Sequence, residues 1–354
     1  MRLLLFNMGM DVDDPPREFI SYWVQELARR MEFIHVITMR AGKVEVPHNV
    51  RVYSVGKEKG YGEPRRAVEF YRHLSRILRE GRIDVCFSHM MPIFTVLAAP
   101  VLRLKGIPIV TWYAHRQITT VLKLAHAVSH CMVSNAATAY RYRHDKLVIV
   151  GHGIDTTLFS PEGAESPNPP LLLSVGRFSP IKDLLVLIEA VDLLRQRGHT
   201  LRCLLVGGAP EQEQSYIAAV RRQVKTLGLE STVQFAGAVP YKEVAQWYRR
   251  CFAHVNLCPT GALDKAALEA MACGKPSLVA NEGFREVLGR WTDRLLFEHG
   301  NATDLVQRIE QLLRMDSAAL RTMGTDLRRN VVAHHSLERL AERLTGLFHE
   351  VKRA

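Results

Sequence analysis

Short apolar runs alternate with amphipathic segments of helix length from one end of the chain to the other. Strands whose apolar residues run almost without interruption are typical of parallel sheets that helices cover on both faces. Regular alternation of such strands with helices indicates an α/β fold. The predicted strands are residues 2–7, 33–38, 50–55, 84–88, 108–112, 127–133 and 146–150, then 171–175, 201–206, 232–236, 253–257, 277–280 and 294–297.

A stretch rich in proline and serine at residues 160–170 interrupts this alternation and is typical of a linker. The sequence therefore predicts one Rossmann-like domain at 1–160, a second at 161–334, and a terminal helix at 335–354. Leucines spaced three and four residues apart give that helix one apolar face. A chain of 354 residues is long enough for two domains that each have a core of their own.

Composition narrows the setting in which such a chain works. The six cysteines show neither a paired CxxC spacing nor a metal-ligand spacing, and most fall in predicted strands or helices. We therefore expect reduced thiols and a cytoplasmic protein. No segment approaches the ~18 uncharged apolar residues of a membrane-spanning helix, and we expect no cleavable signal.

The net charge of +11 is unevenly distributed, because residues 1–160 hold 22 Lys and Arg against 14 Asp and Glu, whereas residues 161–354 hold 25 against 22. Such an excess favours an anionic partner for the first domain. On the helix predicted at 64–80, four arginines share a narrow arc: Arg65, Arg72, Arg76 and Arg79. Either they are simply solvated, or they attract anionic lipid and bring the protein to the inner face of a membrane. No nucleic-acid-binding module is recognisable, so we expect no nucleic-acid partner.

Two segments of the second half carry residues suited to a nucleoside diphosphate. Residues 175–183 end a predicted strand and place Arg177 and Lys182 just before a helix. Residues 267–276 place Glu269 in a short helix that is otherwise small and apolar. Cations near helix N-termini can bind phosphate groups, and a carboxylate can accept hydrogen bonds from ribose hydroxyls.

These segments resemble the family 4 glycosyltransferases, and the resemblance is strongest at residues 171–312. It implies the GT-B fold, in which two Rossmann-like domains face a central cleft and a C-terminal helix crosses back to the first domain. It also implies a hexosyltransferase that uses a nucleotide-diphosphate sugar, retains the anomeric configuration and needs no metal or other cofactor.

The resemblance further implies roles for individual residues. Arg177 and Lys182 would bind the diphosphate and stabilise its charge as it leaves. Glu269 would bind the ribose of the donor, and Gly207 would lie in the loop beneath the nucleotide. In the segment 281–287, Gly283 and Phe284 would contact the donor through backbone amides, because helix N-termini favour anions. Glu286 in the same segment matches a further family position for donor contact; the alternative is a solvated helix glutamate.

The chain departs from the family pattern at one position. A second glutamate usually lies eight residues before the one that matches Glu269, and here that position is Gly261. Asp264 and Lys265 either replace it in donor binding, or Asp264 merely caps the helix that follows.

Three residues of the first half are candidates as well. His115 follows the predicted strand 108–112, and the resemblance places it in the catalytic site near the donor sugar; the alternative is a structural histidine. Gly9, in the loop after the first strand, and His89, at the end of the strand 84–88, are candidates for acceptor binding.

The sequence thus predicts transfer of a sugar to a glycan, a lipid-linked compound or a small molecule. Two other hypotheses stay open. One is a non-catalytic nucleotide-sugar-binding protein, which Gly261 favours. The other is a GT-B-like epimerase or phosphorylase. Turnover of nucleotide sugars separates the three.

Overall fold

The computed structural model describes residues 1–14, 18–162 and 168–353. These divide into two compact units, the first made of Met1–Gly153 with Leu337–Ala354 and the second of Ile154–Ser336. The first unit ends before the boundary predicted at 160/161, because residues after it are held by the second unit. Arg328 Nη1 donates to the Phe159 carbonyl oxygen at 2.9 Å, and Arg249 Nη2 donates to that of Leu158 at 2.8 Å. Residues 163–167 of the predicted linker lie outside the described chain.

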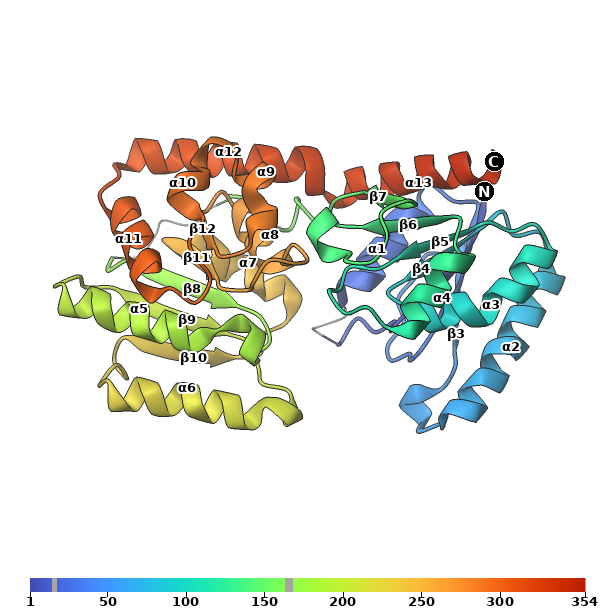
Figure 1. The fold of residues 1–354 in the computed structure, drawn as a ribbon, viewed down its shortest axis with the longest axis horizontal. Coiled ribbons are helices and arrows are strands. Elements are labelled where there is room, and N and C mark those ends of the chain that lie inside the picture. The colour runs from blue at the N-terminus through green and yellow to red at the C-terminus, as the bar shows by residue number, and fades with distance from the viewer. Residues whose placement is uncertain (15–17, 163–167, 354) are drawn as a thin grey trace. The chain divides into compact units, whose positions relative to one another are not determined.

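The first unit is built on a seven-stranded parallel sheet with the order β3-β2-β1-β4-β5-β6-β7, of which Figure 1 labels β3 to β7. The first strand is central, since Leu3 pairs with Ile34 of one neighbour and Val85 of the other. The strands are β1 (Arg2–Asn7), β2 (Phe33–Thr38), β3 (Val50–Ser54), β4 (Val85–His89), β5 (Ile109–Trp112), β6 (Cys131–Ser134) and β7 (Leu147–Ile149).

Helices cover both faces of this sheet. Successive residues of a strand point to opposite faces, so each strand contributes side chains to two cores. Leu3 and Leu5 pack in the core that contains α1 and α13, whereas Leu4 and Phe6 pack in the core that contains α2 and α3. The helices of this unit are α1 (Glu18–Ala28), α2 (Glu63–Glu80), α3 (Pro92–Leu104), α4 (Thr120–Val128) and α13 (Leu337–Arg353). The predicted sheet with two covered faces is confirmed.

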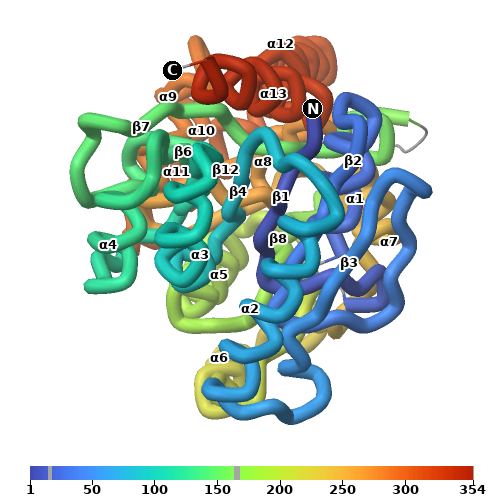
Figure 2. The backbone as a smooth tube through the Cα atoms, turned by 90° about the vertical axis from the view of Figure 1, so that its right-hand side faces the viewer, coloured from blue at the N-terminus to red at the C-terminus, as the bar shows by residue number. Residues whose placement is uncertain are grey.

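The C-terminal helix belongs to the first unit, as predicted. Its apolar face, including Leu340, Leu344 and Phe348, is buried in the same core as α1. Near its end Lys352 Nζ lies 2.7 Å from Asp84 Oδ1, and the other oxygen of Asp84 accepts from the amide of Arg2 at 2.8 Å. Figure 2 accordingly shows α13 running close to the start of the chain.

The second unit contains a five-stranded parallel sheet with the order β10-β9-β8-β11-β12. Its strands are β8 (Leu171–Val175), β9 (Arg202–Val206), β10 (Val233–Gly237), β11 (Ala253–Asn256) and β12 (Ser277–Val279). Its helices are α5 (Leu184–Gln196), α6 (Gln214–Thr226), α7 (Tyr241–Arg250), α8 (Lys265–Ala272), α9 (Arg285–Leu288), α10 (Thr292–Leu295), α11 (Ala302–Leu313) and α12 (Ser317–His335).

The strand order of the second unit places a topological switch point between β8 and β11. From β8 the chain builds outward through β9 and β10 on one side, then returns to build β11 and β12 on the other. In open α/β sheets, ligands bind beyond the carboxyl ends of the strands at such a point. The connections that follow β8 and β11 are therefore where a site is expected.

Two predicted strands differ from the structure. Residues 294–297 were expected as a strand, but Thr292–Leu295 form α10, and only Leu296 bridges to Val279. The strand predicted at 127–133 begins later, at Cys131, because α4 continues to Val128. Both segments are short and apolar, a pattern that suits either element.

Two predictions from composition concern the state of the cysteines and the absence of a membrane-spanning helix. All six cysteines are free thiols, and every one except Cys258 is buried. Across the described residues, no helix combines the length and apolar character needed to span a bilayer.

Candidate functional site

The connection from β8 to α5 begins with a close contact between two backbones. Gly176 and Gly207 follow the ends of β8 and β9 with φ angles of 140° and 142°, in a region that favours glycine. A Cβ on Gly207 would lie 1.9 Å from the Gly176 carbonyl oxygen. Gly207 therefore allows the two loops to touch, which is a structural reason for glycine at this predicted donor position.

Lys182 lies later in the same connection and pairs with Asp264. Its ammonium is near Gly176, since a Cβ there would lie 2.9 Å from Nζ. The same ammonium donates to Asp264 Oδ2. Asp264 comes just after β11 and caps α8, because its Oδ1 accepts from the amide of Ala266 at 3.1 Å. The pair thus joins the two connections that follow β8 and β11, the strands at the switch point.

Two further groups hold the Asp264 carboxylate. Asn256 Nδ2, at the end of β11, donates to Oδ2 at 2.9 Å, and Cys258 Sγ donates to the same oxygen at 3.4 Å. A small part of each charged side chain stays exposed, 15% for Lys182 and 19% for Asp264. The pair is therefore largely shielded from water.

The electrostatics of the pair follow from burial and charge. Burial works against both charged forms, but their mutual attraction and hydrogen bond outweigh it. The pKa of Lys182 is consequently raised, and that of Asp264 is held well below its usual range. Burial, reinforced by the Asp264 carboxylate, raises the pKa of the Cys258 thiol to about 12. The lysine and the aspartate are both charged at neutral pH, whereas this thiol is neutral.

Glu269 lies further along α8 and is also engaged. It is 4% exposed, and its two oxygens accept from Tyr241 Oη at 3.0 Å and Tyr248 Oη at 3.1 Å. Lys265 Nζ is 3.6 Å from Oε1 and lies over the Tyr241 ring, 4.7 Å from its centroid. This satisfies a carboxylate that is otherwise surrounded by small apolar residues.

Arg177 follows Gly176 in the same connection that carries Lys182. It is exposed and forms no ion pair with any of the described residues. The start of α8 thus gathers four of the predicted residues, Lys182, Asp264, Lys265 and Glu269. Arg177 adds an unpaired cation to the same β8–α5 connection.

The loop before α8 is ordered by one side chain after β12. Asn281 Nδ2 donates to the Ala262 carbonyl oxygen at 2.9 Å, and its Oδ1 accepts from the amides of Gly283 at 2.9 Å and Gly261 at 3.4 Å. The Phe284 amide donates to the Asn281 carbonyl oxygen at 3.1 Å, and the Phe284 side chain is fully buried. Both amides donate to Asn281 in this tight turn, so the contact of Gly283 and Phe284 with the donor stays a prediction.

The remaining predicted donor residue, Glu286, lies on α9 and is exposed. No partner is found for its carboxylate in the part of the chain that the structure describes. This position agrees with a solvated helix glutamate.

The candidates in the first unit have different surroundings. His115 is exposed, its Nδ1 accepts from the Gln117 amide at 3.2 Å, and partial desolvation followed by the charge of Arg116 lowers its pKa. Gly9 is buried in the loop after β1. His89 is only 7% exposed, and its ring centroid lies 4.9 Å from that of Trp23. His89 is therefore a core histidine with little surface left for the predicted acceptor contact.

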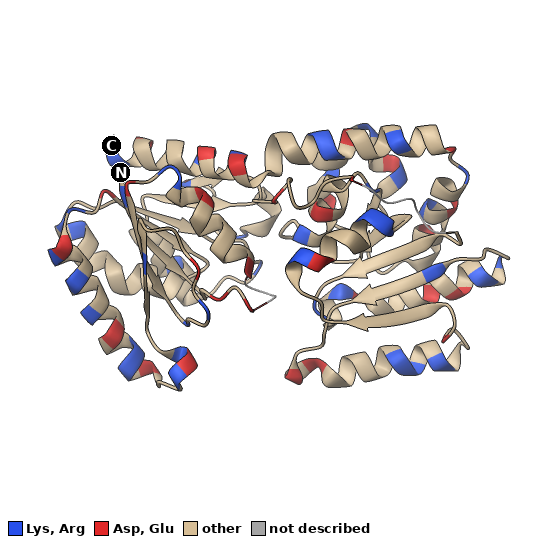
Figure 3. Cartoon of the chain, turned by 180° about the vertical axis from the view of Figure 1, so that it is seen from behind, with Lys and Arg blue, Asp and Glu red and all other residues tan. Residues whose placement is uncertain are grey.

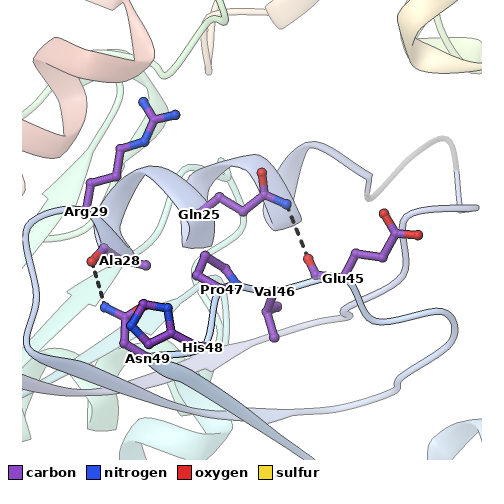
Figure 4. Close-up of a pocket in the computed structure, with 8 residues that line it drawn as sticks. All are labelled: Gln25, Ala28, Arg29, Glu45, Val46, Pro47, His48 and Asn49. Atoms are coloured by element: carbon purple, nitrogen blue, oxygen red, sulfur yellow. Dashed lines mark hydrogen bonds between the residues drawn. The ribbon is translucent and has the colours of Figure 1, made fainter.

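A pocket of 520 Å³ lies elsewhere on the first unit, between α1 and the segment before β3. Figure 4 shows hydrogen bonds along its wall, from Gln25 Nε2 to the Glu45 carbonyl oxygen at 3.2 Å and from Asn49 Nδ2 to that of Ala28 at 2.9 Å. None of the predicted site residues lines it. Among the described residues, no group of three or more His, Cys, Asp and Glu is arranged to hold a metal ion.

Two family models match consecutive parts of the chain. The model described as Glycosyltransferase Family 4 matches residues 18–158, and the model described as Glycosyl transferases group 1 matches residues 155–329. The chain belongs to glycosyltransferase family 4.

Two curated relatives of this family-4 chain are glycosyltransferases by name. The D-inositol 3-phosphate glycosyltransferase of Frankia alni is 32% identical over 184 residues, which cover 48% of this chain and 45% of the relative. The putative colanic acid biosynthesis glycosyltransferase WcaL of Escherichia coli K12 is 30% identical over 186 residues, which cover 50% and 44%. The chain spans somewhat less than half the length of these relatives.

Solved structures confirm the GT-B fold of this family-4 chain. Anabaena Alr3699/HepE in complex with UDP has a TM-score of 0.79 at 17% identity, covering 99% of this chain and 100% of that one. The sucrose-phosphate synthase of Thermosynechococcus elongatus has a TM-score of 0.79 at 18% identity, covering 99% of each chain.

Sequence reasoning missed several residues that build the site. Asn256, Tyr241 and Tyr248 hold the two carboxylates of the α8 region, and Asn281 orders the loop before it. A polar residue ending an apolar strand was a usable signal for Asn256. The two tyrosines lie seven residues apart and so share one helix face, but nothing in the sequence places that face against α8.

Proposed function

We propose that this chain transfers a hexose from a nucleoside-diphosphate sugar to an acceptor, and that its second unit binds the donor. The observation that carries the proposal is the cluster at α8, where Lys182 pairs with Asp264 across the connections that follow β8 and β11, and where the carboxylate of Glu269 is buried. Supporting it, the Anabaena protein of the same fold was solved with UDP and with UDP-glucose. Both curated relatives described above carry the name glycosyltransferase, the second as a putative one.

In the proposed reaction, the bond between the anomeric carbon and the diphosphate oxygen breaks while a bond to the acceptor hydroxyl oxygen forms. The acceptor proton leaves with the departing diphosphate. Lys182 and Arg177 stabilise the negative charge that develops on that diphosphate, which lowers the barrier directly. Glu269 accepts hydrogen bonds from the ribose. The anomeric configuration is retained if the acceptor attacks the face of the sugar from which the diphosphate leaves. Lys182 and Arg177 supply the positive charge that a metal ion would otherwise provide.

A panel of UDP-, GDP- and ADP-hexoses tests this proposal through release of the nucleoside diphosphate. We expect one donor to be consumed, with a rate that EDTA leaves unchanged. The Lys182→Met variant should lose at least about tenfold in kcat/KM, because a charge-assisted hydrogen bond contributes about 1.5–3 kcal/mol. The control is Lys225→Met, which removes an exposed lysine of α6. Full activity of the Lys182 variant would overturn the assigned role.

A non-catalytic nucleotide-sugar-binding protein is the second candidate, and two observations favour it. Gly261 stands where the family usually has a glutamate, and Lys182 is already paired with Asp264. Saturable binding of a donor without turnover, whichever acceptor is added, would support this candidate. Conversion of the donor sugar to its epimer without an acceptor would instead support a GT-B-like epimerase.

The acceptor stays a glycan, a lipid-linked compound or a small molecule.

Peripheral membrane contact would involve α2, along which basic and acidic residues are interspersed (Figure 3). Arg72 is 3.0 Å from Glu69 and Arg76 is 2.8 Å from Glu80, so acidic neighbours offset part of the arginine charge. Sedimentation with vesicles containing anionic lipid should fall when Arg65 and Arg79 are changed to Gln. Unchanged sedimentation would leave these arginines as solvated surface residues.

A further inference from the structure

The Asp264 carboxylate is the most heavily engaged acidic group near the proposed donor site. Its Oδ2 accepts from Lys182, from Asn256 at 2.9 Å and from Cys258 at 3.4 Å, while its Oδ1 accepts from the Ala266 amide at 3.1 Å. A helix cap needs only the last of these contacts. The other three fix a negative charge against one particular lysine.

That lysine is the cation which the proposed function assigns to the diphosphate. In the structure its charge is already neutralised by Asp264, and the charge of Lys265 is likewise opposed by Glu269, 3.6 Å away. The two pairs at the start of α8 therefore carry no net charge. A diphosphate that approaches Lys182 also approaches a carboxylate of its own sign, and like charges at short range repel strongly where water is largely excluded.

We infer that Asp264 sets the affinity of the donor site: it holds Lys182 in place while no ligand is bound, and it weakens the binding of the diphosphate by competing for the same ammonium. The inference rests on the proposed function, because it takes Lys182 as a diphosphate ligand. It makes Asp264 a positioning residue, which acts on the donor through Lys182. It also gives a physical reason for Asp264 beyond the cap that it supplies.

Removal of this one charge should act on both the free and the bound protein. Without Asp264 the Lys182 ammonium is left partly buried and uncompensated, which destabilises the free protein. A bound diphosphate would then supply the missing counter-charge and would no longer meet the repelling carboxylate. Both effects favour the complex, so a neutral residue at position 264 should bind a nucleoside diphosphate more tightly than the native aspartate.

The test compares wild type with Asp264→Asn and Asp264→Ser, since both substitutes can cap α8 without a charge. The control is Asp316→Asn, because Asp316 caps α12 through the Ala319 amide at 2.7 Å and is exposed. Calorimetric titration with UDP, GDP and ADP, and with inorganic pyrophosphate as a probe without a base, measures affinity. The matching nucleosides measure binding without phosphate, and thermal melting of each variant confirms folding.

We expect both Asp264 variants to bind the diphosphate about tenfold more tightly than wild type, which corresponds to about 1.4 kcal/mol. Affinity for the nucleoside alone should not change, and Asp316→Asn should match wild type with every ligand. A purely structural role for Asp264 predicts that diphosphate and nucleoside affinities change together. Equal or weaker diphosphate binding by a folded Asp264 variant, beside a wild type that binds, overturns the inference alone. If neither wild type nor variants bind any of these ligands, the proposed function fails and the inference fails with it.

Discussion

The Lys182→Met substitution probes the ion pair at the switch point most sharply. Methionine keeps much of the length of the side chain but removes its charge, so the Asp264 carboxylate retains only Asn256, Cys258 and the Ala266 amide as donors. Breaking a buried pair by removing one partner costs about 3–5 kcal/mol. The residual exposure of 15% and 19%, with the remaining donors, places this case near the low end, at about 3 kcal/mol.

The assay is thermal and urea unfolding across a pH series. A loss of about 3 kcal/mol corresponds to about 6–12 °C in melting temperature for a unit of this size. The ion pair lowers the pKa of Asp264. The stability that Asp264 contributes is therefore fully present above its pKa in the unfolded chain, about 3.9, and is lost as the pH falls below that value. The pKa of Lys182 is raised, so its contribution is complete below about 10.4 and is lost as the pH rises further.

The stability difference between wild type and Lys182→Met should therefore be flat from about pH 5 to 9 and shrink in acid and in strong base. Adding Asp264→Asn to Lys182→Met should restore part of the lost stability, because no unpaired charge then remains. Lys225→Met serves as the control, since Lys225 is exposed on α6. A Lys182 variant that melts within 1–2 °C of this control, with no dependence on pH, would refute the reasoning.

Three further substitutions, one of them with a matched control, give separable outcomes. Gly207→Ala should lower the free energy of unfolding by about 3 kcal/mol in urea titration, because its Cβ would lie 1.9 Å from a carbonyl oxygen. In the control Gly208→Ala, the added Cβ would lie 3.7 Å from its nearest neighbour, so the free energy of unfolding should hardly change. Equal losses of stability in the two variants would contradict this prediction. Arg177→Ala should weaken UDP binding about tenfold in calorimetry without changing the melting temperature or uridine affinity. Glu269→Gln should weaken the binding of UDP and of uridine to the same extent. A loss of affinity for UDP alone would show that Glu269 does not bind the ribose.

The sequence was sufficient for the sheets and for the terminal helix, because these depend on apolar periodicity. The alternation of Leu3 and Leu5 with Leu4 and Phe6 fills two cores, and the leucine face of α13 fills one of them. Periodicity failed where an apolar run was too short to favour either element. The run around Leu295 ends a helix, since residues 292–295 close an α-helical turn before the bridge at Leu296.

For the candidate site, sequence reasoning found the charged residues but not their partners. Lys182 stood out because it lies just before a predicted helix, and Glu269 because its helix is otherwise small and apolar. Their pairing with Asp264 and Lys265 depends on which strand ends become neighbours, and that is fixed by the strand order of the folded sheet. The hydrogen bonds of the 281–284 turn were not foreseen for the same reason, since the Asn281 side chain folds back on its own loop.

The most direct test of the central claim is a crystal structure of the protein with a bound nucleoside diphosphate, beginning with UDP. The account predicts phosphate oxygens within hydrogen-bonding distance of Lys182 Nζ, with the ribose hydroxyls at Glu269. A nucleotide bound away from the ends of β8 and β11, with Lys182 untouched by phosphate, would contradict it.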